Sequence, residues 1–147
     1  MLVLLLMAVF LVFICIRFHC SILCRTAMFI SRNKFSPTTN MMIVLLNALS
    51  AHIVEIFLYS LALYVNVVYF EAGHISGDFD GDLLSYFYFS MVSYTSLGLG
   101  DVWPHGPIRL LTGIEALNGL ILIAWSASYT YSFHEKSMGG NTLEKQH

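Results

Sequence analysis

The sequence predicts an all-α membrane protein with three long apolar helices and one short helix that enters the membrane and returns. The first indication is composition, because 57% of the 147 residues are apolar and only 11% are charged. A soluble domain carries charge on roughly a quarter of its residues. The second indication is that the apolar residues fall into three runs of nearly spanning length or longer, plus one shorter aromatic run.

The first apolar run covers residues 1–16, "MLVLLLMAVFLVFICI". A spanning helix needs about 17–25 residues, so this run barely reaches the required length. A cleaved signal peptide is the alternative. The run lacks a basic region before it and a small-residue cleavage site after it, which favours a retained helix.

The second and third runs cover residues 41–70 and 110–133, and both are long enough to cross with some tilt. Only His52 and Glu55 interrupt the second run. Near the start of the third run, Glu115 and Asn118 lie about one helical turn apart.

Charge predicts the orientation of these spans. Between the first two runs lie basic residues and no carboxylate: Arg17, Arg25, Arg32 and Lys34. Residues 71–108 contain carboxylates and no Lys or Arg. By the positive-inside rule, residues 17–40 are cytoplasmic and residues 71–108 are outside. We therefore expect a multi-pass protein of the plasma (cell inner) membrane with its N-terminus outside and its C-terminus cytoplasmic. A net charge of -2 without a basic block argues against a nucleic-acid partner.

The aromatic run, residues 83–96, has too few residues to cross as a helix, and Gly98, Gly100 and Pro104 follow it. It must enter the membrane and return on the same side. Irregular backbone at membrane depth is tolerated where it is buried in protein or lines a wet cavity. Carbonyl oxygens that replace the hydration shell of a cation would explain such a segment. Glycines can adopt positive φ and turn successive carbonyls toward one axis, and Ser96 adds a hydroxyl oxygen.

The residues "YTSLGLGDVWP" are similar to the pattern T-[TS]-V-G-[YF]-G-D followed by an aromatic residue and a proline. Together with the flanking spans, they resemble the pore domain of the potassium channel superfamily, including its small bacterial members. The resemblance covers residues 41–133 as outer helix, re-entrant pore helix, selectivity filter and inner helix. Residues 1–40 are then an extra N-terminal transmembrane helix with a basic cytoplasmic linker, and residues 134–147 are a short cytoplasmic tail.

This resemblance implies a passive potassium-selective ion channel. One chain carries one filter segment, so a closed ring of carbonyls implies a homotetramer among membrane lipids. Potassium ions in the filter are the expected ligands, with no other cofactor. The implied ion-binding residues are Ser96, Leu97, Gly98, Leu99 and Gly100. Asp101 matches the aspartate at the outer mouth, and Gly119 matches a hinge glycine of the inner helix.

Three residues depart from the family pattern. Leu99 replaces the usual Tyr or Phe of the filter, Leu97 replaces Val, and Val92 stands where some bacterial members place a Glu that pairs with the outer aspartate. The change at Leu99 leaves a weakly selective cation channel as an alternative. A non-conducting accessory or sensor module on a pore-like fold is a second alternative. An enzyme is not expected, because no nucleophile, base and orienting group come together.

Several residues allow two interpretations. Glu115 and Asn118 could line the pore below the filter or brace the pore helix, or they could form a polar contact between helices. Gly119 could be a gating hinge, or it could let two helices approach closely. His52 and Glu55 could bind a metal or sense pH, but a buried hydrogen-bonded pair is favoured because two ligands do not make a metal site.

The outer loop contains the acidic sequence "DFDGD", with Asp78, Asp80 and Asp82. These carboxylates would raise the local concentration of cations at the mouth of the pore. A calcium site is the alternative, but the spacing lacks the glycine position and the distal Glu of an EF-hand loop.

Overall fold

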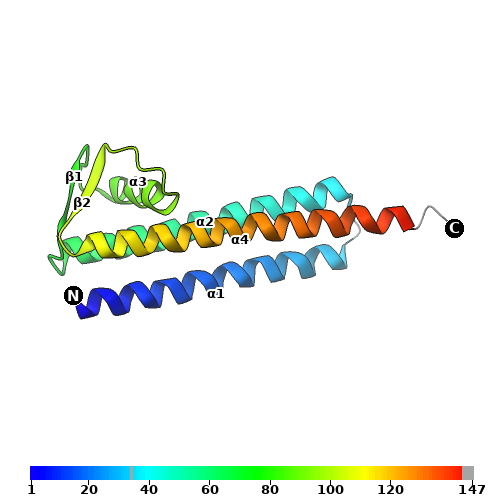
Figure 1. Cartoon of the computed structure of the whole chain (residues 1–147), viewed down its shortest axis with the longest axis horizontal. Helices are drawn as coiled ribbons and strands as arrows, with labels where there is room; N and C mark the ends of the chain where they lie inside the picture. Colours follow the sequence, from blue (N-terminus) through cyan, green and yellow to red (C-terminus); the bar gives the residue numbers. More distant parts are fainter. Residues whose placement is uncertain (34, 144–147) are drawn as a thin grey trace.

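A computed structural model of the chain describes residues 1–33 and 35–143. Three long helices run side by side in it (Figure 1): α1 (Leu2–Arg32), α2 (Pro37–Val68) and α4 (Ile108–Leu143). The remaining elements are the short helix α3 (Leu83–Tyr94) and the strands β1 (His74–Gly77) and β2 (Val102–His105). These three short elements lie together at the end of the bundle where α1 begins.

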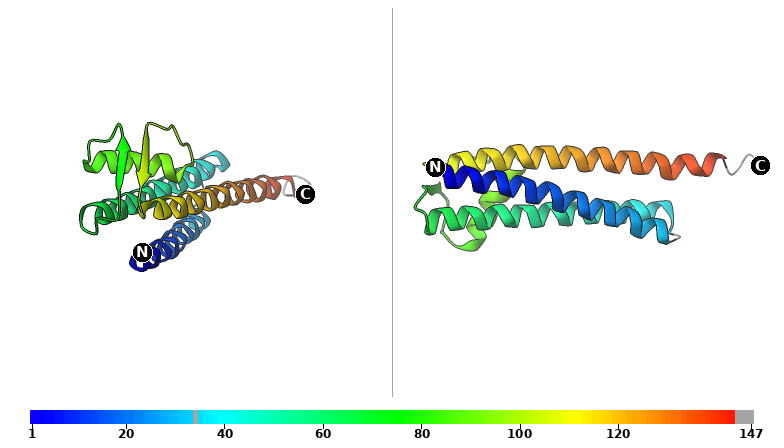
Figure 2. Two further views of the ribbon diagram at one scale, coloured as in Figure 1. Left: turned by 60° about the vertical axis from the view of Figure 1, so that its left-hand side comes forward. Right: turned by 90° about the horizontal axis from the view of Figure 1, so that it is seen from below.

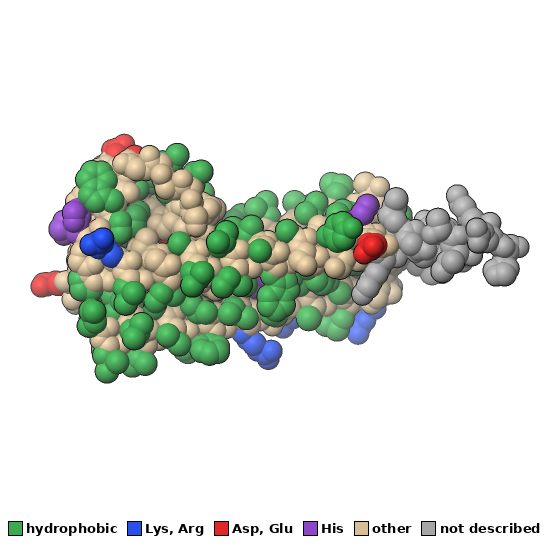
Figure 3. Space-filling model, in the orientation of Figure 1, with side chains coloured by type: hydrophobic (Ala, Val, Ile, Leu, Met, Phe, Trp, Pro, Cys, Tyr) green, Lys and Arg blue, Asp and Glu red, His purple; other side chains and the backbone are tan. Residues whose placement is uncertain are grey.

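All three long helices are long and apolar enough to cross a membrane, so the three expected spans are confirmed as candidate spans. Helix α2 runs antiparallel to α1 and α4, and α1 contacts both of them (Figure 2). The C-terminal end of α4 and the connection from α1 to α2 therefore lie opposite the end that carries α3. Apolar side chains are spread along the face of the bundle shown in Figure 3, as a lipid-facing surface requires.

Helix α1 is longer than the sequence suggested, because residues 17–32 continue the helix instead of forming a linker. Its buried residues recur every three or four positions: Leu4, Ala8, Leu11, Cys15, His19, Leu23, Thr26 and Ile30. That spacing places one continuous stripe against the neighbouring helices. Arg17, Arg25 and Arg32 all lie on the exposed face, where a long side chain can carry its charge away from the apolar surface. The basic residues thus interrupt the hydropathy pattern without interrupting the helix.

Helix α2 begins a few residues before the expected residue 41, at a capped terminus. The hydroxyl oxygen of Ser36 accepts a hydrogen bond from the backbone N–H of Thr39 at 3.2 Å. Pro37 occupies the first turn, where its missing N–H costs nothing. The expected re-entrant helix is confirmed as α3, which ends at Tyr94.

The expectation of an all-α protein was wrong in one respect, because the segment between α2 and α4 contains a two-stranded antiparallel sheet. His74 pairs with His105, and Gly77 pairs with Val102. Ile75 and Val102 are buried, which anchors the sheet to the bundle. Since β2 begins directly after Asp101, the sheet fixes the chain where it leaves the re-entrant segment.

Asp82 is the N-cap of α3. Its Oδ1 accepts hydrogen bonds from the hydroxyl of Ser85 at 2.6 Å and from the backbone N–H of Ser85 at 2.7 Å. These bonds favour the ionised carboxylate and hold the pKa of Asp82 below its ordinary value, the side-chain bond contributing most. In the described part of the chain, Asp78, Asp80 and Asp82 do not form a group of close metal ligands, so the calcium alternative gains no support.

The lowered pKa predicts an acid dependence of stability. The stabilisation from the ionised cap is complete above the unfolded-state pKa and is lost as the pH falls through the lower folded-state pKa. Asp82→Asn keeps a capping oxygen but cannot titrate. We expect the difference in unfolding temperature between the wild type and Asp82→Asn, in detergent, to shrink as the pH is lowered from neutral into the acid range. A constant difference across that range would contradict this role.

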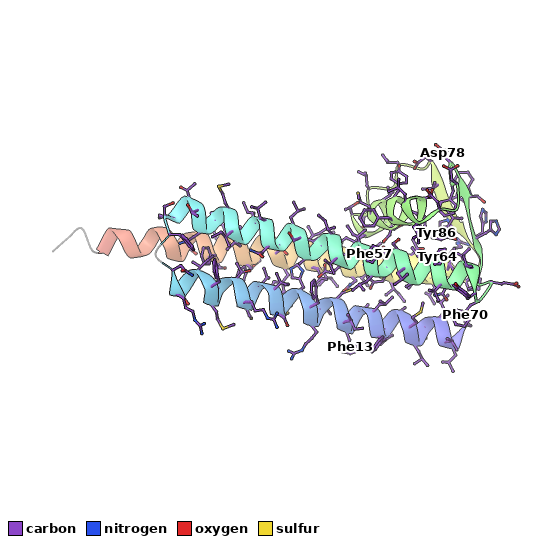
Figure 4. All side chains as sticks on the ribbon, turned by 180° about the vertical axis from the view of Figure 1, so that it is seen from behind. Phe13, Phe57, Tyr64, Phe70, Asp78 and Tyr86 are labelled. Carbon is purple, nitrogen blue, oxygen red and sulfur yellow. The ribbon has the colours of Figure 1, made fainter. Side chains whose placement is uncertain are left out.

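Aromatic residues fill the contact between α2 and α3. Tyr86 of α3 packs edge-on against Tyr64 of α2, with ring centroids 5.4 Å apart (Figure 4). Tyr86, Phe89 and Tyr94 are all buried. The re-entrant helix is therefore fixed to the chain's own outer helix by large apolar contacts.

Candidate functional site

The segment between α3 and β2 is irregular, and its glycines adopt the left-handed conformation that the sequence suggested. Gly98 has a φ of 57° and Gly100 has a φ of 83°. Ser96 also has a positive φ, of 55°, which is uncommon for a residue with a Cβ atom. Positive φ angles thus recur at every second residue, at Ser96, Gly98 and Gly100. They turn the backbone so that it does not continue α3 as a helix.

The carbonyl oxygens of residues 96–100 accept no hydrogen bond in the described part of the chain. Residues 95–100 are all exposed in the single chain, and Leu97 and Leu99 are 62% and 60% exposed. Backbone groups without partners are costly at membrane depth. These oxygens are therefore available to ligands from outside the chain.

Asp101 closes this segment and is held from two sides. The hydroxyl of Tyr88 donates to Asp101 Oδ2 at 2.5 Å, and the N–H of Asp78 donates to the carbonyl oxygen of Asp101 at 2.9 Å. Val92, the position of the missing glutamate, is buried and lies one turn after Tyr88 on α3. A tyrosine hydroxyl thus braces the Asp101 carboxylate, a contact that no pattern in the sequence indicated.

Glu115 and Asn118 lie inside the chain, between helices. Glu115 is fully buried, and Ser90 of α3 hydrogen-bonds to its Oε1. The Ser90 hydroxyl also lies 2.8 Å from the carbonyl oxygen of Ile56 in α2. For Glu115, this arrangement favours a polar contact between α3 and α4 over a pore-lining position. Asn118 is also buried, at 2% exposure.

Gly119 of α4 lies against the end of α3. A Cβ atom at this position would come within 2.1 Å of the carbonyl oxygen of Tyr94. By contrast, a Cβ atom at Gly113 would meet nothing within 4 Å. The geometry favours close approach of two helices as the reason for glycine at position 119, and the hinge alternative stays a prediction without support here.

His52 and Glu55 form the expected hydrogen bond, with 3.2 Å between His52 Nδ1 and Glu55 Oε2. They belong to a larger group that we call the buried polar cluster: His19, His52, Glu55, Tyr94 and Ser126. His19 Nδ1 lies 2.9 Å from Glu55 Oε1, and the hydroxyl of Tyr94 donates to Glu55 Oε2 at 2.5 Å. The cluster joins all four helices. His19 was not identified from the sequence as a candidate site residue. The one indication in the sequence is that His19 falls on the buried stripe of α1.

Comparison with protein families supplies the identification. A family model described as "Ion channel" matches residues 51–136, which include most of α2, all of α3, the segment after it and α4 up to residue 136. The chain belongs to this ion-channel family. The resemblance to a potassium-channel pore is thereby confirmed at the level of the family, and so is the expectation that the protein is not an enzyme. Comparisons with curated proteins and with solved structures find no match.

The irregular segment of the channel lies within the matched residues, between α3 and α4. Helix α1 lies outside the matched residues. It nevertheless packs against α2 and α4 and shares the buried polar cluster with them. The channel is therefore an ion-channel pore unit with an additional helix fixed to its side.

Tyr88→Phe is expected to reduce ion flux through the channel while leaving its unfolding temperature nearly unchanged. The substitution removes the hydroxyl that donates to Asp101, so the outer end of the filter segment loses its link to α3. The ring itself is retained. Flux from liposomes and thermal unfolding in detergent measure the two effects. Wild-type flux in Tyr88→Phe would show that the brace is dispensable.

Proposed function

We propose that the protein is a passive potassium-selective channel. The observation that carries the proposal is the row of free carbonyl oxygens on residues 96–100, which follow the pore helix and lack partners in the described chain. Such oxygens can replace the hydration shell of a potassium ion. The proposed ligands are the backbone oxygens of Ser96, Leu97, Gly98, Leu99 and Gly100, with the Ser96 hydroxyl at the inner end.

We propose a homotetramer as the conducting form. One chain supplies one filter segment, so carbonyls can surround an ion only when several copies share an axis. The exposure of Leu97 and Leu99 supports assembly, because apolar side chains next to free backbone require cover from neighbouring copies. In this assembly the pore domain comprises residues 41–133, with residues 1–40 as a peripheral segment and residues 134–147 as the tail.

The proposed orientation places α3 and the sheet outside and the α1–α2 connection in the cytoplasm of the cell. The basic residues Arg25 and Arg32 support it, because they lie in the half of α1 far from α3. Asp101 and the exposed carboxylates of the outer loop then face the external mouth. There they raise the local concentration of cations.

A weakly selective cation channel is the second candidate, and Leu99 is the observation that favours it. Where the family pattern has Tyr or Phe, leucine offers no ring and no hydroxyl to hold the filter against the pore helix. A filter with weaker lateral support can admit ions of different radius. The first candidate is preferred because both glycines hold the conformation that orients the carbonyls.

Flux from liposomes tests the proposal. Purified protein is reconstituted into vesicles loaded with potassium chloride, and flux is followed with and without external barium, a divalent ion close to potassium in size. We expect potassium flux that barium blocks and a much smaller flux when sodium replaces potassium. Equal sodium and potassium flux would support the weakly selective channel. Absence of flux from a folded oligomer would overturn the proposal and favour a non-conducting module.

A further inference from the structure

We propose that His19, His52 and Glu55 bind one divalent transition-metal ion of the zinc type. Glu55 Oε1 lies 2.9 Å from His19 Nδ1, and Glu55 Oε2 lies 3.2 Å from His52 Nδ1. One ligand atom from each of the three residues lies within 4.8 Å of the others. Two ligands come from α2 and the third comes from α1, so the site exists only in the folded bundle.

The separations suit a small metal ion. Zinc binds imidazole nitrogen and carboxylate oxygen at about 2.0–2.2 Å, so the ligand atoms of a tetrahedral site lie about 3.4 Å apart. Side-chain rearrangement must bring the three ligand atoms, which lie within 4.8 Å of one another, to that separation. Two imidazoles and one carboxylate suit zinc and its neighbours, whereas calcium and magnesium prefer sites made of oxygen.

A second observation comes from the atoms around the ligands. Histidines that bind a metal through one ring nitrogen donate a hydrogen bond from the other. Both Nδ1 atoms face Glu55, and His52 Nδ1 also lies 3.0 Å from the Tyr94 hydroxyl. Both Nε2 atoms face Ser126 Oγ, at 2.7 Å from His19 and 3.1 Å from His52. When both Nδ1 atoms hold a metal, each Nε2 carries a proton, and a hydroxyl oxygen can accept two hydrogen bonds. Ser126 is therefore placed to orient both imidazoles.

The carboxylate is oriented in the same way. The Tyr94 hydroxyl donates to Glu55 Oε2 at 2.5 Å, which fixes the plane of the carboxylate that ligates the metal. His52 is the partly exposed ligand, with 14% of its side chain exposed, whereas the side chains of His19 and Glu55 are fully buried. In the proposed site, three members of the buried polar cluster bind the metal, and the other two, Tyr94 and Ser126, orient those ligands.

Zinc titration of the full-length protein in detergent, after treatment with a chelator, tests the site. We expect one zinc ion per chain by elemental analysis and a rise in unfolding temperature with zinc. Cobalt in place of zinc should give the visible absorption of a tetrahedral centre. His19→Gln and His52→Gln should each weaken zinc binding at least about tenfold, and Ser126→Ala should weaken it by roughly tenfold to a hundredfold while keeping one ion per chain.

His105→Gln is the matched control. It removes an imidazole from a second pair of histidines, His74 and His105, whose rings stack in the β1–β2 sheet with centroids 4.6 Å apart. We expect this variant to bind zinc as the wild type does. A wild-type protein that takes up no stoichiometric zinc would overturn the proposal, whatever the variants do. Zinc binding that persists in folded His19→Gln or His52→Gln would also overturn it. These measurements do not depend on ion flux, so they test the metal site separately from the proposed function.

Discussion

Gly98→Ala is expected to reduce potassium flux at least about tenfold. Gly98 has a φ of 57°, and a side chain in this left-handed region costs roughly 1–2 kcal/mol per chain. In a homotetramer the cost arises four times around one ring. Rotation of the peptide relieves the strain but turns a carbonyl away from the ion path. Flux from liposomes measures the loss.

Gly81→Ala is the control for this experiment. Gly81 lies in the outer loop with a φ of 79°, and a Cβ atom at either Gly81 or Gly98 meets nothing within 4 Å in the chain. The two substitutions therefore impose similar backbone strain at different places. We expect Gly81→Ala to conduct like the wild type. If both variants lost flux equally, the loss would reflect general strain and not the orientation of the filter carbonyls.

Gly119→Ala is expected to lower both stability and flux. The new methyl group would lie within 2.1 Å of the Tyr94 carbonyl oxygen, so the end of α3 or the helix α4 must move. Such overpacking costs about 1–3 kcal/mol. Because Tyr94 lies two residues before Ser96, the displacement reaches the first of the proposed ion-binding oxygens. Thermal unfolding in detergent and flux from liposomes measure the two effects.

Gly113→Ala provides the comparison, since this position on the same helix is open to a Cβ atom. Alanine is also the better helix former by about 0.5–1 kcal/mol. We expect Gly113→Ala to be as stable as the wild type or more so, and to conduct. A hinge at Gly119 makes a different prediction, namely altered flux in Gly119→Ala at unchanged stability.

The order of the membrane segments could be predicted from sequence because it depends on local properties. The length of each apolar run and the glycines after residue 96 were sufficient for the spans and for the re-entrant helix. Helix α1 was underestimated because hydropathy averages over a window. Arg17 ends the apolar run, and Arg25 follows it, although both lie on the exposed face and leave the buried stripe intact.

The sheet and the buried polar cluster depend on contacts between residues far apart in the chain. Strands β1 and β2 have four residues each, and Pro104 within β2 argues against a strand by local rules. His19 meets Glu55 across 36 positions, and no periodicity connects them. The filter residues could be proposed from a motif, whereas the Tyr88 brace and the packing of Gly119 required the relative positions of α3, Asp101 and α4.

A density map of the purified oligomer in potassium tests the central claim most directly. We expect four copies around one axis, with the carbonyl oxygens of residues 96–100 facing that axis and a row of ion densities between successive rings of oxygens. Helix α1 should lie on the outside of each copy, against α2 and α4. An oligomer in which residues 96–100 face away from a common axis, or in which no ion density lies between their carbonyls, would contradict the account.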